Sequence, residues 1–140
     1  MNNETLVRDL FKAIETRDID RVLEIYDPEV EFHWPPALPY GGSTRGASSG
    51  SSEASWQSVW LPLQPEPSDR HLDPRVIASN DREVVVLYHQ RGRDPQGNVF
   101  DGEVIGLYEV MDSKLRRAQM FSFDERALLE FLRHAQVKSS

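Results

Sequence analysis

The chain has 140 residues, which is the size of one domain with a single sizeable core. Its 23 acidic residues outnumber 16 basic ones, the net charge is -7, and the basic residues are scattered along the chain. This balance argues against nucleic-acid binding, which needs positive charge gathered on one face. The chain has no cysteine, which excludes disulfides, thiolate nucleophiles and cysteine-ligated zinc.

Signals for export or membrane insertion are not found in the sequence. No apolar run reaches the roughly 20 residues that span a bilayer, and residues 1–4 lack the basic and apolar regions of a secretory signal. We therefore expect a cytoplasmic protein that does not interact with membranes. No shift in composition marks a boundary, so we expect residues 1–140 to form one domain.

The first 34 residues predict two helices and a strand. Residues 5–26 carry apolar side chains at helical spacing, and the pattern breaks once at residues 16–18, so Asp18 is expected to cap a second helix. Residues 30–34 then alternate, with Trp34 on the apolar face and His33 on the opposite, surface or interface face.

The rest of the chain predicts a turn, a short helix, a group of strands and a closing helix. Residues 39–46 have the composition of a turn, residues 48–55 form a serine-rich patch, and residues 56–63 predict a short helix. The expected strands cover residues 74–78, 83–93, 99–111 and 115–123, and a helix is expected over residues 125–136. Helices followed by strands, without regular alternation, indicate an α+β fold.

This order of elements resembles the nuclear transport factor two-like superfamily, whose branches include the SnoaL-like polyketide cyclases and the ketosteroid isomerases. The resemblance is carried by Ile19-Asp20 through Tyr26-Asp27-Pro28-Glu29-Val30, by Pro39-Tyr40-Gly41-Gly42 to Gly46, and by Met120-Phe121-Ser122-Phe123-Asp124. It implies a cone in which a curved antiparallel or mixed sheet wraps around the N-terminal helices and encloses a pocket. It also implies a homodimer formed through the outer face of the sheet.

The resemblance does not extend to the catalytic residues of the ketosteroid isomerases. Trp34 stands where those enzymes have a general-base aspartate, Leu10 aligns with their oxyanion tyrosine, and Gly106 aligns with their oxyanion aspartate. Because that chemistry needs a base and paired oxyanion donors, we do not expect ketosteroid isomerase activity.

The SnoaL-like branch suggests other catalytic candidates. Its final strand often delivers a carboxylate to the pocket, and Asp124 ends that strand here. On a neighbouring strand, His89 and Arg91 share a face that the alignment turns inward. His89 and Asp124 would then act as an acid/base pair while Arg91 holds an anionic oxygen. Alternatively, His89 and Arg91 are solvated and Asp124 only caps the last helix.

Large side chains predict a pocket for a flat or polycyclic hydrophobic small molecule. The expected substrate-binding residues are Trp34, Tyr40, Trp56, Trp60, Tyr108, Met120 and Ser122. The four histidines lack metal-ligand spacing, and the glycines form neither a dinucleotide fingerprint nor a phosphate loop, so we expect no metal and no cofactor.

Two functions remain open at this point. The first is a SnoaL-like enzyme that performs cofactor-independent acid/base catalysis, such as cyclisation, isomerisation, dehydration or hydrolysis. The alternative is a non-catalytic ligand-binding or protein-interaction domain of the same fold. Convergence of His89, Arg91 and Asp124 on one cavity would favour the enzyme, whereas solvated positions would favour binding.

Overall fold

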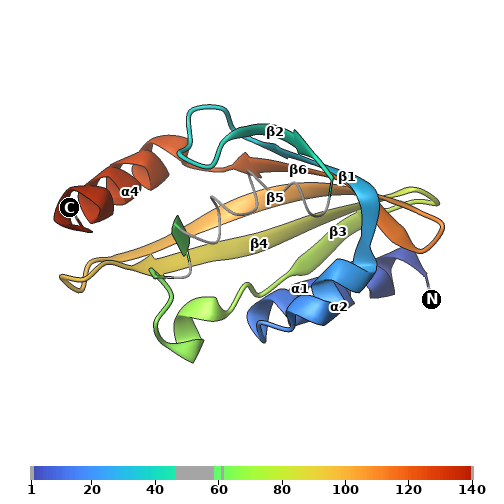
Figure 1. The fold of residues 1–140 in the computed structure, drawn as a ribbon, viewed down its shortest axis with the longest axis horizontal. Helices are drawn as coiled ribbons and strands as arrows, with labels where there is room; N and C mark the ends of the chain where they lie inside the picture. The colour runs from blue at the N-terminus through green and yellow to red at the C-terminus, as the bar shows by residue number, and fades with distance from the viewer. Residues whose placement is uncertain (1, 47–58, 61, 140) are drawn as a thin grey trace.

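The computed structural model describes residues 2–46, 59–60 and 62–139 (Figure 1). The helices are α1 (Asn3–Glu15), α2 (Ile19–Ile25), the 3-10 helix η1 (Pro67–Arg70) and α4 (Glu125–Ser139). The strands are β1 (Tyr26–Trp34), β2 (Gly42–Arg45), β3 (Arg75–Ser79), β4 (Glu83–Arg93), β5 (Val99–Met111) and β6 (Lys114–Ser122). The serine-rich patch, and most of the helix expected over residues 56–63, lie outside the described residues.

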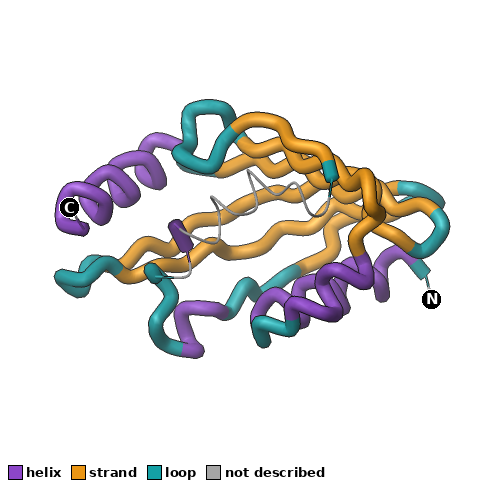
Figure 2. The backbone as a smooth tube through the Cα atoms, in the orientation of Figure 1, coloured by secondary structure: helices purple, strands orange, loops and turns teal. Residues whose placement is uncertain are grey.

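The six strands form one curved, open sheet in the order β2-β1-β6-β5-β4-β3. Neighbours pair antiparallel except β1 and β6, which pair parallel. Figures 1 and 2 show α1 and α2 against one half of the sheet and α4 at its other end. The predicted α+β cone with a mixed sheet is therefore confirmed.

The long hairpin of β4 and β5 has the bounds that the sequence predicts, because its turn carries strong local signals. The Asp94 carboxylate accepts hydrogen bonds from the main-chain N–H groups of Gln96 and Asn98, both at 2.9 Å. Gly97 adopts a φ of 90°, in the left-handed region that glycine enters without steric cost. These bonds fix the point at which the chain reverses.

The break between α1 and α2 also lies where the sequence predicts it. Arg17 has a φ of 61°, which ends α1, and the Asp18 side chain accepts a hydrogen bond from the main chain of Arg21 at 3.2 Å. This is the expected N-cap of the second helix. The left-handed residue turns the chain back sharply, so that α2 packs beside α1.

Part of the segment predicted as a turn is a strand. Gly42 pairs with Trp34, so residues 42–45 add an antiparallel edge strand to β1. The register is extended by Gly46, whose N–H donates to the Val30 carbonyl at 2.8 Å. A four-residue strand made of glycine and small polar residues has no alternation of its own, so only the pairing with β1 reveals it.

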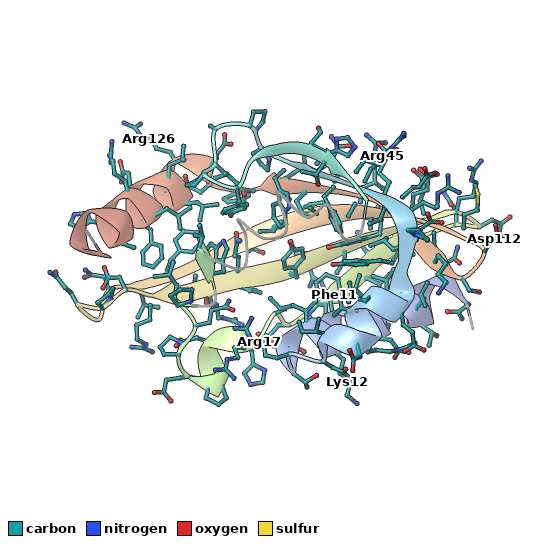
Figure 3. The ribbon with its side chains drawn as sticks, in the orientation of Figure 1. Phe11, Lys12, Arg17, Arg45, Asp112 and Arg126 are labelled. Atoms are coloured by element: carbon teal, nitrogen blue, oxygen red, sulfur yellow. The ribbon has the colours of Figure 1, made fainter. Side chains whose placement is uncertain are left out.

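Two groups of buried side chains stabilise the fold. The larger group lies between the sheet and α1–α2, and the smaller one lies under α4. Figure 3 shows Phe11 pointing from α1 towards the sheet and Lys12 pointing away, as expected for an amphipathic helix. Trp34 packs against both groups, so it stands at the boundary between them.

Candidate functional site

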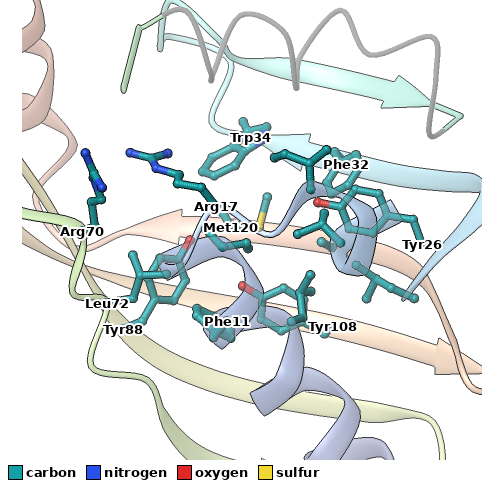
Figure 4. Close-up of a pocket in the computed structure, with 16 residues that line it drawn as sticks. Phe11, Arg17, Tyr26, Phe32, Trp34, Arg70, Leu72, Tyr88, Tyr108 and Met120 are labelled. Atoms are coloured by element: carbon teal, nitrogen blue, oxygen red, sulfur yellow. The ribbon is translucent and has the colours of Figure 1, made fainter. Parts of the chain in front are cut away.

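A cavity of about 470 Å³ lies between the inner face of the sheet and the two N-terminal helices (Figure 4). This volume is within the usual range of small-molecule sites. Most of its wall is aliphatic or aromatic, with Phe11 from α1, Phe32 from β1 and Met120 from β6 among the lining residues. Among the described residues, its wall contains no carboxylate and no imidazole.

Three tyrosines, Tyr26, Tyr88 and Tyr108, contribute phenol groups to this apolar wall. Tyr88 and Tyr108 line the cavity, and each ring makes an edge-to-face contact with Phe11, at centroid distances of 4.9 and 5.7 Å. Burial raises the pKa of Tyr88 well above its usual value, and the neighbouring Tyr108 raises it further. Burial likewise raises the pKa of Tyr108. Both hydroxyls are therefore neutral at physiological pH. The two side chains hydrogen-bond each other, so one hydroxyl proton is engaged between them and the other can be donated to a ligand.

The Tyr108 ring occupies the space that a side chain at position 106 would need. A Cβ built on Gly106 would meet the Tyr108 ring and hydroxyl at 2.5 Å. Position 106 is where the resemblance to the ketosteroid isomerases would place their oxyanion aspartate. The glycine at 106 therefore leaves room for a phenol, instead of a carboxyl group, at this part of the cavity.

Among the residues that the structure describes, two arginines are the charged members of the cavity wall. Arg17 comes from the break between α1 and α2, and Arg70 comes from η1. The Oε1 atom of Gln64 accepts from Arg17 Nη2 at 3.0 Å, and the main-chain oxygen of Gln64 accepts from Arg70 Nε at 3.1 Å. Sequence reasoning did not select either arginine, because no local pattern joins a helix break to a proline-rich connection.

Several predicted substrate-binding residues do line the cavity. Trp34, Tyr108 and Met120 belong to its wall, so their position is as predicted, and ligand contact stays a prediction. Ser122 shares the inward side of β6 with Met120 by alternation, but lies at the strand end and outside the cavity wall.

Two other predicted wall residues lie elsewhere. Tyr40 and Trp60 are 1% and 0% exposed and belong to the smaller buried group under α4, so their expected position in the wall is wrong. Gln90 Nε2 donates to the Tyr40 hydroxyl at 3.1 Å, and burial raises the pKa of Tyr40 to about 12. Trp56 lies outside the described residues.

The expected inward position of His89 and Arg91 is also wrong. Along β4 the buried side chains are Val84, Val86, Tyr88 and Gln90, so the residues between them face the outer side of the sheet. The strand is apolar on both faces over residues 84–88, and alternation alone does not decide which face turns inward. Tyr88, which precedes His89 in the chain, lines the cavity instead of His89.

On the outer face, His89 and Arg91 form a polar network with Asp101. His89 Nδ1 lies 2.8 Å from one carboxylate oxygen of Asp101, and Arg91 Nε donates to the other at 3.1 Å. Arg91 also pairs with Asp73 at 2.8 Å. Burial opposes ionisation of Asp101, but the hydrogen bonds from His89 and Arg91 outweigh it and lower the pKa of this carboxyl group. This network orders neighbouring segments and does not reach the cavity.

Asp124 acts as the cap of α4. Its carboxylate accepts a hydrogen bond from the main-chain N–H of Ala127 at 3.1 Å, and the residue is not part of the cavity wall. The three predicted catalytic residues therefore do not meet in one cavity.

The described part of the chain holds neither a metal-binding cluster nor a membrane-spanning helix. No group of three or more histidine, aspartate or glutamate side chains is arranged there to hold a metal ion. None of the helices within these ranges has the length and apolar character needed to cross a membrane.

The curved, open sheet and the N-terminal helices that pack against it form the cone fold of the nuclear transport factor two-like proteins. More narrowly, the chain belongs to the SnoaL-like domain family, whose model matches residues 7–118. No curated protein sequence matches it.

Solved structures with the same fold share little sequence with this chain. TerC, co-crystallised with polyporic acid, has a TM-score of 0.77 at 21% identity over 94% of this chain and 98% of TerC. A protein of unknown function with a cystatin-like fold from Xanthomonas campestris has a TM-score of 0.76 at 23% identity, over 94% of this chain and 98% of the Xanthomonas protein. A nuclear transport factor two-like protein from Burkholderia xenovorans has a TM-score of 0.68 at 22% identity, over 95% of this chain and 94% of the Burkholderia protein. Similarity at this level of identity shows the fold alone.

The raised pKa values of the buried tyrosines predict a loss of stability in alkali. Above about pH 10, tyrosines of the unfolded chain lose their phenolic protons, whereas the buried tyrosines of the folded protein keep theirs. The free energy of unfolding therefore falls as the pH rises above about 10. Below that pH, these groups do not change it. The slope is up to about 1.4 kcal/mol per pH unit for each such tyrosine. Chemical denaturation between pH 8 and 11.5 measures the slope of the free energy of unfolding against pH. The Tyr108→Phe variant should have a smaller slope, because one buried tyrosine no longer contributes to it. Tyrosinate absorbance from all tyrosines of a still-folded protein at pH 11 would contradict the burial.

Proposed function

We propose that this protein binds a flat, hydrophobic small molecule in the cavity between the sheet and the N-terminal helices. The observation that carries the proposal is a wall of mostly aliphatic and aromatic side chains around about 470 Å³. Burying an apolar ligand there gains roughly 25 cal/mol for each Å² removed from water. The hydroxyls of Tyr88 and Tyr108 would orient a carbonyl or hydroxyl group of the ligand.

Titration with N-phenyl-1-naphthylamine, a neutral naphthalene whose fluorescence rises in apolar surroundings, tests this proposal. We expect saturable binding of one probe molecule per chain, together with a higher melting temperature, because a ligand that binds only the folded state stabilises it. Weak, non-saturating fluorescence and an unchanged melting temperature would refute ligand binding in the cavity.

A second candidate is the SnoaL-like enzyme that uses acid/base chemistry without a cofactor. The two neutral phenols favour it, because donors in an apolar cavity can stabilise negative charge on a carbonyl oxygen as an enolate forms. We place it second because the described wall offers no carboxylate or imidazole as a base.

We also propose that two copies of the chain associate through the outer face of the sheet. An apolar patch on that face is formed by Val85, Leu87, Ile105, Leu107 and Phe121. Phe121 is 49% exposed in the single chain. The Arg91–Asp101 ion pair lies beside the patch, so the charged groups at its rim are already neutralised within each copy.

Replacement of a residue at the centre of this patch is expected to separate the copies. Leu107→Asp places a charge in the interface and should weaken dimerisation at least tenfold, as measured by sedimentation equilibrium. Leu23→Asp is the matched control, because Leu23 is 46% exposed on α2, away from the sheet's outer face. A wild-type protein that stays monomeric at high concentration, or an unaffected Leu107 variant, would contradict this interface.

A further inference from the structure

We propose that Arg17 and Arg70 form an anion-binding site at the edge of the apolar cavity, and that the ligand is therefore an amphipathic acid. Such a ligand has a flat apolar body and one acidic group, for example a carboxylate, a sulfonate or an acidic enol. The inference rests on the proposed ligand-binding function and narrows the class of ligand. Figure 4 shows the two guanidinium groups next to each other, with the rings of Tyr88, Tyr108 and Phe32 around the rest of the cavity.

The first supporting observation is that these two charges have no acidic partner in the part of the chain that the structure describes. Within the described residues, no carboxylate oxygen lies within 4.0 Å of Arg17 or Arg70, whereas Arg21, Arg91 and Arg93 each form an ion pair. The chain has 23 acidic residues and only 16 basic ones, so carboxylates are plentiful. A partly buried positive charge without a counter-charge is costly, and a bound anion would remove that cost.

The second observation is that Gln64 holds both guanidinium groups in position. Gln64 is 4% exposed, and its Nε2 donates to the Arg91 main-chain oxygen at 2.9 Å, which fixes the amide. Its Oε1 accepts from Arg17, and its main-chain oxygen accepts from Arg70. Arg70 makes one further bond, to the Pro65 carbonyl at 3.3 Å. Since each guanidinium carries five N–H donors, most remain available for an anion.

The third observation is electrostatic. Burial lowers the pKa of Arg17, and repulsion from Arg70 lowers it further. Arginine nonetheless remains charged in proteins, so two like charges are held close together beside an apolar cavity. An acidic group between them would relieve the repulsion and accept charge-assisted hydrogen bonds from both, while the body of the ligand extends towards Met120 and Tyr108.

Two fluorescent probes with the same ring system test the proposal. N-phenyl-1-naphthylamine is neutral, and 1-anilinonaphthalene-8-sulfonate adds one sulfonate to the same rings. We expect the wild-type protein to bind the sulfonate about tenfold or more tightly than the neutral probe, which is the effect of one or two charge-assisted hydrogen bonds. The preference should fall as salt is added, because ions screen partly exposed charges.

Matched variants attribute this preference to the two arginines. The double variant Arg17→Gln with Arg70→Gln should bind both probes with equal affinity, and its circular dichroism spectrum and melting temperature show whether it is folded. Glutamine keeps a hydrogen-bonding side chain and loses the charge. Arg126→Gln, on the exposed face of α4, is the control and should retain the full preference. If the double variant does not fold, each single variant should lose part of the preference.

The outcomes separate this inference from the function on which it rests. Equal affinity of the wild-type protein for both probes, or a preference that survives in the arginine variants, overturns the anion site and leaves cavity binding intact. Failure of the neutral probe to bind overturns the proposed function itself. Sulfonate binding that persists when Ala118→Phe fills the cavity would place the dye on another surface and would also overturn the anion site.

Discussion

We expect the Ala118→Phe variant to lose at least a hundredfold in affinity for N-phenyl-1-naphthylamine. Ala118 is 2% exposed on β6, and its paired neighbours on the adjacent strands are Tyr108 and Phe32, which line the cavity with it. A phenyl ring at this position would extend into the empty space instead of into packed side chains. It would occupy the volume that the probe needs, so binding is blocked sterically.

The same variant is expected to remain folded. Adding atoms to a filled core costs about 1–3 kcal/mol, but here the added ring enters a void, so the melting temperature should change little. Ala78→Phe is the matched control, because Ala78 is exposed on the edge strand β3 and lies outside the cavity wall. Wild-type affinity in the Ala118 variant would show that the probe binds elsewhere, with the outer apolar patch as the first place to look.

The second large effect concerns stability instead of binding. Trp60→Ala should destabilise the protein by about 3–5 kcal/mol, because it removes a fully buried indole and leaves a cavity. The ring lies against Gly92, where an added Cβ would meet Trp60 Cζ3 at 2.8 Å, and its centroid is 6.4 Å from those of Tyr40 and Phe100. The melting temperature should fall by on the order of 10 °C.

Probe affinity separates this structural role from the ligand-contacting role that the sequence suggests for Trp60. Well below the melting temperature, Trp60→Ala should bind the neutral probe as the wild type does, because the residue is not part of the cavity wall. Trp60→Phe should recover part of the lost stability, since a ring again fills part of the space. Weakened probe binding with an unchanged melting temperature would place Trp60 at the ligand instead.

Local signals explain why much of the fold could be predicted. The bounds of β4 and β5 follow from alternation and from the Asp94 to Gly97 turn, whose hydrogen bonds involve residues close in sequence. The helix break at Arg17 and the Asp18 cap are equally local. By contrast, β2 exists only because β1 offers free backbone groups beside it, and its own composition resembles a turn.

The candidate site was predicted less well, because its residues come from distant segments. Side-chain size and alternation predict Trp34, Tyr108 and Met120 as wall residues, and all three line the cavity. The pair Gly106 and Tyr108 carried a usable signal, since alternation places both on one face of β5 and a glycine there leaves room for the ring. For β4 no such signal decided between the two apolar faces.

The sequence by itself determined the α+β class, the family and the order of the longer elements, α1, α2, β1, β3 to β6 and α4, because periodicity, turns and caps depend on neighbours along the chain. Only the tertiary structure decided that Tyr88 instead of His89 faces the cavity, since the curvature of the sheet selects the buried side of a strand that is apolar on both faces. It also decided that Arg17 and Arg70 meet at Gln64. Their positions depend on how a helix break and a proline-rich connection pack against one another, and no local pattern encodes that packing.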